Sequence, residues 1–511
     1  MSGNLARVSN GAALPLKKVP KLSPGAFRDC VIASVASGSR LVALCADEKL
    51  QLFAIMADDE AGILGMARTA LSKPAYPALT PECPAAQLFE REMAEQQGLL
   101  PEGHPWFKPV RGHLPGRPGP DPFGRKPAEV LAGLIPFYRV EGTSIHEVGV
   151  GPVHAGVIEP GHFRFQCLGE EVFHLEIALG YQHRGIERAL LGGPHAATLK
   201  MMESAAGDTT IGHTWAYCQN IEALSGIAPG PRASLIRAIA LELERLANHT
   251  GDLGALAGDV GFLPTSSFCG RIRGDWLNLS ALLCGSRLGR DLVRPGGVGF
   301  DLDGDRCLEL RTRMEKAWAE TQAAVNLLWQ APTVMQRFER VGLLTGEQAQ
   351  EIGAVGPAAR ASGLRLDVRL QHPLSGSSQS LIPHGWDDPA GSGGDVFARA
   401  WVRWREMHHS IDFLSKAVSA LGALGEGKKA ERRDRPALGA NQVCLSLVEG
   451  WRGEIAHLAV TDAGGAFSLY KVIDPSFHNW SGLALAMRGG QISDFPLCNK
   501  SFNLSYCGVD L

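Results

Sequence analysis

The cysteine residues of this chain are the first candidates for metal or redox chemistry. There are 11 of them in 511 residues, an odd number, and no two form a Cys-x-x-Cys pair. Closely spaced cysteine pairs usually hold iron–sulfur clusters and structural zinc ions, so neither is expected within this chain. His408 and His409 are adjacent and face different sides of a helix, so a metal pair from them alone is not expected. Cys498 and Cys507 are predicted to be free buried thiols, with a disulfide or a metal site as the alternative.

The composition is that of a globular protein. Apolar residues make up 45% and charged residues 20%, and the formal net charge is −3. This balance is too apolar for a disordered chain and gives no basic field for nucleic acid. No stretch approaches the ~18–20 uninterrupted apolar residues of a membrane span, and the first 30 residues lack the apolar core of a signal peptide. We therefore expect a soluble protein of a reducing compartment, with two or three domains.

The N-terminal part of the sequence predicts a small α+β unit. Apolar runs at 30–37, 41–44 and 50–55 indicate short strands, and residues 85–97 indicate a helix. Proline and glycine then accumulate at 101–127, which is typical of a connector. Two further connectors are predicted at 383–394 and 425–436.

After Gly151 the pattern becomes mainly helical. Apolar residues recur at helical spacing from Pro231 to His249, with Gly251 as the expected end of that helix. The clearest helix is 395–421, which has an apolar stripe and Asp395 as its N-cap. Alternating apolar residues after Ala437 predict strands. The predicted fold is therefore α+β: a small N-terminal α+β domain, followed by a large, mainly helical bundle domain with small peripheral β-sheets.

Several segments, in order along the chain, carry a more specific signal. The first contains Gly-Pro-Val-His at 151–154 and Glu-Pro-Gly-His-Phe-Arg at 159–164. The others are Tyr181–Glu187, Ile236–His249, Gly394–Met407 and Glu449–Glu454. Together they resemble the superfamily of [NiFe]-hydrogenase large subunits and the 49 kDa-type, quinone-reducing subunits of respiratory complex I.

The N-terminal unit carries a resemblance of its own. Its segments Ala78–Pro81, Pro84–Ala86, Glu90–Glu92 and Gly103–Pro105 are similar to the 30 kDa-type subunit that lies beside the 49 kDa-type one. The resemblance implies that the two are fused here, as in formate-hydrogenlyase-type hydrogenases. It divides the chain into a 30 kDa-like domain at 1–125, a linker at 126–150 and a 49 kDa-like domain at 151–511.

The resemblance also shows what is missing. Four thiolates hold the metals in a [NiFe] centre, and their positions fall here on Ala206, Thr209, Ser505 and Gly508, with Cys507 one residue out of register. Alanine and glycine offer no side-chain donor, and hard, neutral hydroxyl groups do not replace thiolates. The implied protein belongs to a metal-less branch. It is not a functional hydrogenase, and we expect no cofactor bound by this chain.

Four residues form the predicted catalytic set. Glu159 matches the glutamate that relays protons beside the metal in hydrogenases, and His162 is expected to donate a hydrogen bond in the same pocket. Asp208 and His213 crowd the former metal cavity, where they could supply protons near neutral pH. The alternatives are purely structural roles for Glu159 and His162, and a solvated loop at Asp208–His213.

Three further residues are predicted to contact a bound acceptor. His154 matches the histidine near the start of the complex I branch, and His183 and Arg184 lie at a strand-to-helix corner that they are expected to brace. The tyrosine that the complex I branch carries around the first cysteine pair has no counterpart, since Tyr217 lies later in the sequence.

The implied function is that of the hydrophilic electron-transfer subunit of a membrane-bound, complex I-like oxidoreductase that reduces a quinone or another small acceptor. The implied partners are a small iron–sulfur subunit with a [4Fe-4S] cluster, a ferredoxin-like subunit and integral-membrane ion-pumping subunits. The implied location is peripheral, on the cytoplasmic side of the cell membrane. One alternative is an inert scaffold that couples the partners. Another is a different metal held by Asp208, His213 and other hard ligands.

Overall fold

The N-terminal part of the chain folds as a sheet with two helices packed against it. The computed structural model describes residues 4–511 except 118, 132, 155, 157, 375–390 and 425–435, so most of the two later predicted connectors lies outside the described residues. The sheet has the order β1–β6–β5–β4, with β3 paired to β6. Its strands are β1 (Ala6–Val8), β3 (Lys21–Leu22), β4 (Arg40–Ala46), β5 (Gln51–Asp58) and β6 (Ile63–Ala70). The helices are α1 (Pro24–Ala36) and α2 (Gln87–Gln97).

The strand predicted at 30–37 is wrong, because these residues lie almost entirely in the second half of α1. The Ser23 hydroxyl caps this helix by accepting a hydrogen bond from the backbone N–H of Ala26, and Pro24 occupies its first turn. Cys30 and Val31 are buried. A short apolar run has the same composition in a buried helix as in a buried strand, which explains the error.

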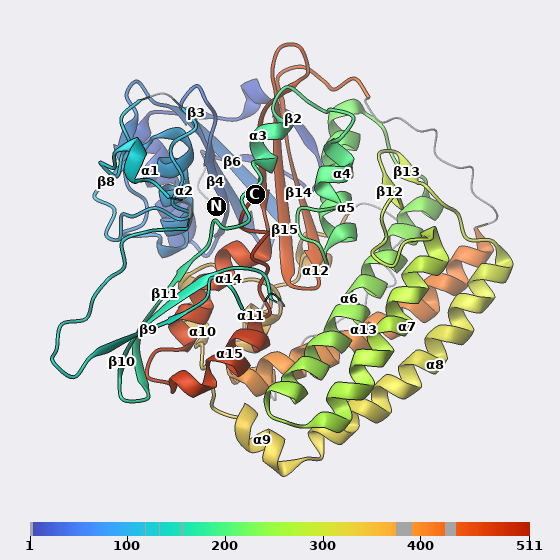
Figure 1. Cartoon of the computed structure of the whole chain (residues 1–511). Helices are drawn as coiled ribbons and strands as arrows, with labels where there is room; N and C mark the ends of the chain where they lie inside the picture. The colour runs from blue at the N-terminus through green and yellow to red at the C-terminus, as the bar shows by residue number, and fades with distance from the viewer. Residues whose placement is uncertain are drawn as a thin grey trace.

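Four long helices form the bundle and lie side by side in Figure 1. They are α6 (Pro231–Asp259), α7 (Leu263–Cys284), α8 (Gly304–Trp329) and α13 (Val396–Ala423). The start of α13 is as predicted, since the Asp395 carboxylate accepts a hydrogen bond of 2.8 Å from the Ala398 N–H. The predicted end of α6 at Gly251 is wrong. A Cβ atom on Gly254 would lie 2.6 Å from Cβ of Cys269 on α7, so the glycines on this face of α6 allow α7 to approach closely.

A second sheet joins the two ends of the chain. Its order is β16–β15–β14–β2, and the strands are β2 (Ala13–Pro15), β14 (Gln442–Gly450), β15 (Gly453–Thr461) and β16 (Phe467–Ile473). The strands predicted after Ala437 are therefore confirmed. Arg40 in the N-terminal unit also forms an ion pair of 2.8 Å with Glu454 on β15. These contacts cross the expected boundary at residue 125, and the division into domains stays a prediction.

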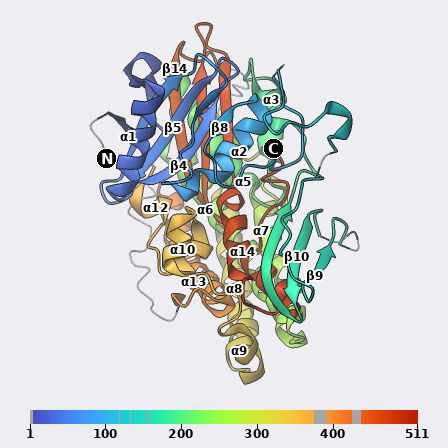
Figure 2. The same ribbon diagram turned by 90° about the vertical axis from the view of Figure 1, so that its left-hand side faces the viewer.

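Most of the remaining elements are short (Figures 1 and 2). The longest of them, α5 (Thr210–Ser225), is buried and packs against β14. A third sheet has the order β11–β10–β9, formed by β9 (His146–Val150), β10 (His162–Leu168) and β11 (Glu171–Ala178). The small strand pairs are β7 (Ala75–Pro77) with β8 (Leu100–Glu102) and β12 (Val293–Arg294) with β13 (Gly297–Val298). The other helices are α3 (Ile186–Leu190), α4 (Thr198–Met202), α5 (Thr210–Ser225), α9 (Pro332–Phe338), α10 (Gly346–Glu351), α11 (Gly356–Ala361), α12 (Val368–Gln371), α14 (Pro475–Ala486) and α15 (Phe495–Phe502). The predicted α+β class is confirmed. No helix in the described ranges is long and apolar enough to cross a membrane.

The interior of the bundle holds a network of buried charges centred on Glu406 of α13. Its carboxylate accepts hydrogen bonds from Arg360 at 2.6 Å and from His249 at 2.8 Å, and it lies 3.4 Å from Arg245. Arg360 also pairs with Glu449 on β14 at 2.9 Å. All five side chains are buried. Buried charges are tolerated only when they are paired and hydrogen-bonded, so this network fixes how the helices and the sheet meet.

Replacing Glu406 with glutamine should destabilise the protein strongly. The substitution keeps the shape of the side chain but leaves Arg360 and Arg245 short of a negative charge in the interior. Breaking a buried pair in this way costs about 3–5 kcal/mol. Denaturant unfolding of the purified protein measures the change. Glu315→Gln on the exposed face of α8 is the control and should shift stability by less than about 0.5 kcal/mol. Equal stability of the two variants would contradict this account of the network.

Candidate functional site

Three of the four positions predicted to correspond to thiolate ligands lie around one cluster of polar side chains. Thr209 precedes α5, and its Oγ1 atom lies 3.3 Å from Nη1 of Arg452. Ser505 and Gly508 lie in the C-terminal tail, where the Gly508 N–H donates to Ser505 Oγ at 2.9 Å. A Cβ atom on Gly508 would lie 2.9 Å from Oδ2 of Asp474. Side chains from the β14–β15 hairpin and from the start of α14 therefore occupy this place.

The central interaction of the cluster is a bidentate ion pair between Arg452 and Asp208. Nη1 and Nη2 of Arg452 lie 2.6 and 2.8 Å from the two carboxylate oxygens of Asp208. Burial alone raises the pKa of Asp208, but the Arg452 guanidinium outweighs it and holds the pKa below its usual range. The Asp208 side chain is 35% exposed and that of Arg452 only 4%. Asp208 is therefore the partly exposed member of the pair, and Arg452 is the buried one.

His213 lies behind this pair in a line of buried hydrogen bonds. Its Nε2 atom is 3.0 Å from Oδ2 of Asp474, and its Nδ1 atom is 3.1 Å from Nε2 of His457. Nδ1 of His457 is in turn 3.0 Å from the hydroxyl of Tyr470. Burial, and next His213, lower the pKa of His457, so this ring is neutral. The consistent assignment has Tyr470 donating to His457, His457 to His213, and His213 to Asp474. Because both nitrogens of His213 are engaged, it can orient Asp474 but does not face an acceptor directly.

Glu159 and Arg184 hold the C-terminal tail in place. The carboxylate oxygens of Glu159 accept hydrogen bonds from the backbone N–H groups of Tyr506 and Cys507 at 3.3 and 3.2 Å. Arg184 donates to the carbonyls of Ala205 and Cys507 at 2.8 and 3.0 Å. Arg184 thus joins the loop before α5 to the C-terminal tail. These contacts agree with bracing roles for both residues, and their predicted roles in chemistry stay predictions.

The three other predicted histidines, His154, His162 and His183, form their contacts with residues outside the Asp208–Arg452 pair. His154 hydrogen-bonds to the carbonyl of Gly161 at 2.9 Å. His162 contacts the carbonyl of Gly151 at 3.2 Å and the ring of Phe137, and the structure does not bring it to Asp208 or His213.

The ring of His183 lies 4.5 Å from that of His113. Burial, and next the Arg111 charge, lower the pKa of His183 to about 4, so it is neutral near pH 7. Acceptor binding by His154 and His183 stays a prediction.

Sequence reasoning missed Arg452, Asp474, His457 and Tyr470 as members of the site. Arg452 lies inside the recognised segment 449–454. An arginine in that segment was the available sequence signal for a cation near the predicted metal-ligand positions. Asp474 was not recognisable from a motif, since its role depends on the start of α14 lying beside His213.

A nickel–iron centre does not fit the side chains at this place. Ala206 and Gly508 offer no donor atom, and the one thiol nearby belongs to Cys507, 3.5 Å from Ser505 Oγ. Burial, followed by the charge of Glu159, raises the pKa of Cys507 to about 11, so it stays a protonated thiol. All 11 cysteines are free. Cys498 is buried as predicted, whereas Cys507 is only partly buried, so the prediction of a buried thiol is wrong for Cys507. Within the described ranges no three histidine, cysteine, aspartate or glutamate side chains are grouped to hold a metal ion.

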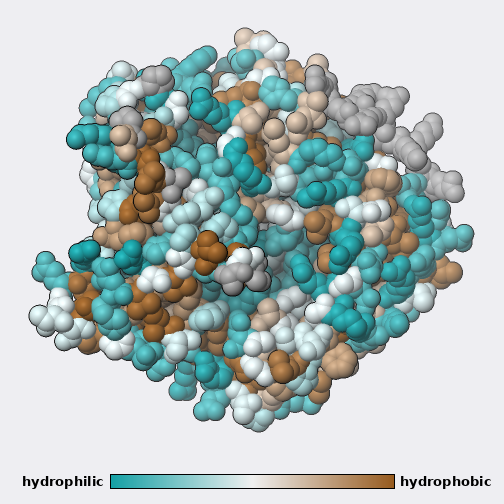
Figure 3. All heavy atoms as spheres, in the orientation of Figure 1, coloured by the Kyte–Doolittle hydropathy of each residue, from teal (hydrophilic) through white to brown (hydrophobic). Residues whose placement is uncertain are grey.

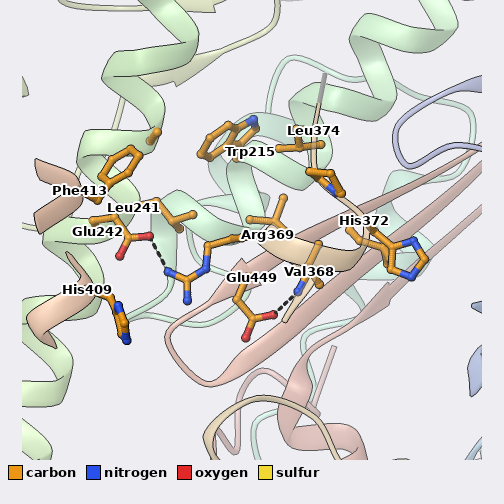
Figure 4. Close-up of a pocket in the computed structure, with 14 residues that line it drawn as sticks. Trp215, Leu241, Glu242, Val368, Arg369, His372, Leu374, His409, Phe413 and Glu449 are labelled. Carbon is orange, nitrogen blue, oxygen red and sulfur yellow. Dashed lines mark hydrogen bonds and ion pairs between the residues drawn. The ribbon is translucent and has the colours of Figure 1, made fainter. Parts of the chain in front are cut away.

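A small cavity lies beside Glu449, three residues before Arg452 (Figure 4). Its volume of about 60 Å³ leaves room for a few water molecules, since one needs at least ~10–15 Å³. Figure 4 shows Arg369 directed at Glu242, with which it forms an ion pair of 3.0 Å. Glu449 accepts a hydrogen bond from the Val368 N–H at 3.0 Å. Burial, and next the charge of Asp367, raise the pKa of Glu449 to about 7. A group that can gain or lose a proton near neutral pH therefore lies on the same hairpin as Arg452.

Comparison with known proteins gives a consistent set of relatives. A family model described as "Respiratory-chain NADH dehydrogenase, 49 Kd subunit" matches residues 259–511. The chain is 30% identical to formate hydrogenlyase subunit 5 of Escherichia coli over 455 residues, which are 86% of this chain and 77% of that protein.

Two further relatives come from other organisms. NADH-quinone oxidoreductase subunit 4 of Thermus thermophilus is 29% identical over 374 residues, 69% of this chain and 90% of that protein. The membrane-bound hydrogenase subunit alpha of Pyrococcus furiosus is 28% identical over 368 residues, 70% of this chain and 85% of that protein. Hydrogenase and NADH-quinone oxidoreductase subunits are thus similar to this chain to nearly the same degree.

Glu244 on α6 gives the site a testable pH dependence. Its carboxylate accepts hydrogen bonds from the backbone N–H groups of Ile211 and Gly212 at the start of α5. Burial, reinforced by the charge of Asp208, raises the pKa of Glu244 from 4.5 to about 8. The folded state therefore binds this proton more tightly than the unfolded state. Its contribution to stability is complete below pH 4.5 and is lost as the pH rises to about 8.

Glu244→Gln keeps a neutral side chain at every pH. We expect the variant to lose less stability than the native protein between pH 5 and pH 9, as measured by denaturant unfolding across that range. Glu315→Gln on the surface of α8 should follow the native curve. A native-like pH slope in Glu244→Gln would show that Glu244 does not carry this proton.

Proposed function

This chain belongs to the superfamily that unites [NiFe]-hydrogenase large subunits with the 49 kDa subunit of respiratory NADH dehydrogenase, and from this membership we propose that it is the hydrophilic subunit of a membrane-bound, complex I-like oxidoreductase. In this assembly it receives electrons from a [4Fe-4S] cluster of a small iron–sulfur partner. It passes them to a quinone or a similar small acceptor. A ferredoxin-like subunit and ion-pumping membrane subunits complete the proposed assembly.

The observation that carries this proposal is the Asp208–Arg452 pair where hydrogenases hold their metals. Guanidinium and carboxylate groups have no redox chemistry of their own, so any electron that reaches this place must be taken up by a bound acceptor. A quinone that becomes a quinol takes up two electrons and two protons. The partly exposed Asp208 side chain provides a contact for the acceptor, because its ionised carboxylate can accept a hydrogen bond from a hydroxyl group of the reduced, quinol form. Arg452 holds this carboxylate in place. His213 and Asp474 fix this arrangement from behind.

The alternative, an inert coupling subunit, is favoured by a different observation. Both nitrogens of His213 have buried partners, and Glu159 and Arg184 tie the loop and the tail together. Such a place could be a rigid remnant of a metal site that only transmits mechanical coupling between partners. The variants described below separate the two roles.

The proposed location is at the membrane through partner subunits, on the cytoplasmic side. Large apolar side chains are exposed on and near the β9–β11 sheet, and Figure 3 shows brown atoms gathered in this region. They are Tyr138, Val153, Ile158, Leu168 and Phe173. Exposed apolar surface of this kind supports docking to another protein.

The purified complex should contain no nickel in stoichiometric amount. Ala206, Thr209, Ser505 and Gly508 lack thiolates, and Arg452 supplies a positive charge where a metal cation would otherwise lie. Elemental analysis should find iron from the partner clusters as an internal control. About one nickel atom per chain would overturn the proposal of a metal-less site.

Substitutions at the site should separate acceptor reduction from scaffolding. If the acceptor binds at Asp208, then Asp208→Asn should slow acceptor reduction by the assembled complex by at least tenfold. The substitution removes the carboxylate and, with it, the negative charge that balances Arg452. His213→Gln should also slow it, with the larger effect on kcat, because Asp474 loses its orientation. Asp305→Asn on the surface of α8 is the matched control and should be unchanged. Subunit stoichiometry is measured in parallel. Normal turnover of both site variants in fully assembled complexes would establish the scaffold role instead.

A further inference from the structure

A second, larger cavity lies between the N-terminal unit and the rest of the chain. Its volume is about 400 Å³, which is within the range of small-molecule sites. The residues that line it come mainly from β4, from α2, from the loop after β8, from α3 and from β16. Figure 2 shows α2 and α3 close to the C-terminus of the chain in this region. None of its lining residues belongs to the Asp208–Arg452 pair or to the His213 line, except that Tyr470 is common to that line and to this cavity.

The inner carboxylates of this cavity are already engaged. Glu95 accepts hydrogen bonds from three successive backbone N–H groups, at residues 111–113. Glu92 pairs with Arg111 and with Lys471, each at 2.7 Å. Glu187 pairs with Lys471 at 2.9 Å and accepts from the Val472 N–H. These acids therefore have little capacity to bind a further cation.

Two residues that line the cavity each have a buried side-chain nitrogen with no partner in the described part of the chain. The first is Nη1 of Arg111, whose side chain is only 2% exposed while its Nε and Nη2 atoms are held by Val509 and Glu92. The second is Nε2 of His113, whose ring lies against His183. A buried charged donor without a partner is costly, and native proteins usually satisfy it with a ligand or ordered water. The nearby carboxylates outweigh burial and raise the pKa of Arg111, so the guanidinium stays charged at every physiological pH.

Two further arginines line the same cavity. Arg117 lies in the loop after β8 and Arg188 in α3. Neither forms an ion pair with any residue in the described ranges. Arginine prefers carboxylate and phosphate oxygens because its planar donors match them in pairs. Asp47 and Glu48 also line the cavity, and their charges disfavour a ligand with several negative groups.

We propose that this cavity binds a small molecule through a single carboxylate or phosphate group, which is held by Nη1 of Arg111 and Nε2 of His113 with Arg117 and Arg188 around it. Because the site is built from both parts of the fused chain, its ligand would tie the N-terminal unit to β16 and α3. The inference does not depend on acceptor reduction at Asp208, and either can fail without the other.

The test uses the purified complex, with inorganic phosphate and acetate as separate probes in isothermal titration calorimetry. Saturable binding of phosphate alone would assign a phosphate ligand, and saturable binding of acetate alone a carboxylate ligand. Arg117→Gln/Arg188→Gln should weaken binding of the preferred probe at least fivefold, and His113→Phe should weaken it further. The matched control is Arg287→Gln/Arg290→Gln, which removes two exposed arginines after α7 and should bind as the native complex does.

Arg111→Lys gives the sharpest result if the complex assembles, because lysine keeps the charge beside Glu92 and removes the free Nη1 donor. Its binding should be abolished. If that variant does not assemble, the other two variants decide. The proposal is overturned if neither probe binds the native complex saturably, or if His113→Phe and the Arg117/Arg188 variant both bind with native affinity.

Discussion

The structure depends on the pairing of buried charge around the turn of the β14–β15 hairpin. Arg452 at this turn pairs with Asp208, and Arg245 of α6 donates to the backbone carbonyls of Glu449 and Gly450 just before it. A charge left unpaired in such an interior costs several kcal/mol. The hairpin, α6 and the loop before α5 must therefore meet in one arrangement. This constraint also fixes the position of the Asp208 carboxylate.

The exchange of a metal centre for an ion pair changes what the place can do. Four thiolates and their metals form a group whose charge changes with redox state, whereas arginine keeps a fixed positive charge. Asp208 and Asp474 balance that charge, and each has its pKa held low by its cationic or imidazole partner once burial is outweighed. The result is an electrostatic site that can orient a bound molecule but cannot itself store an electron.

Much of this arrangement could be predicted from the sequence, and the failures have physical causes. The N-cap at Asp395 and the strands after Ala437 followed from local signals. The strand at 30–37 failed because burial hides the difference between helix and strand. The end of α6 failed because its glycines serve the contact with α7. Asp474 could not be found, since only the folded chain brings the start of α14 to His213.

The charge at the site is itself an argument about its role. Apolar side chains of similar volume would fill the space left by a lost metal at less cost than an ion pair, because burying charges requires their desolvation. Arg452 is nevertheless almost fully buried, and its partner Asp208 remains partly exposed. A rigid filling has no need of a partly exposed carboxylate that is paired with a buried cation. The pair instead holds an ionised carboxylate in a fixed orientation, where it can accept a hydrogen bond from a bound molecule. The proposed acceptor site requires such a group, whereas a mechanical scaffold does not.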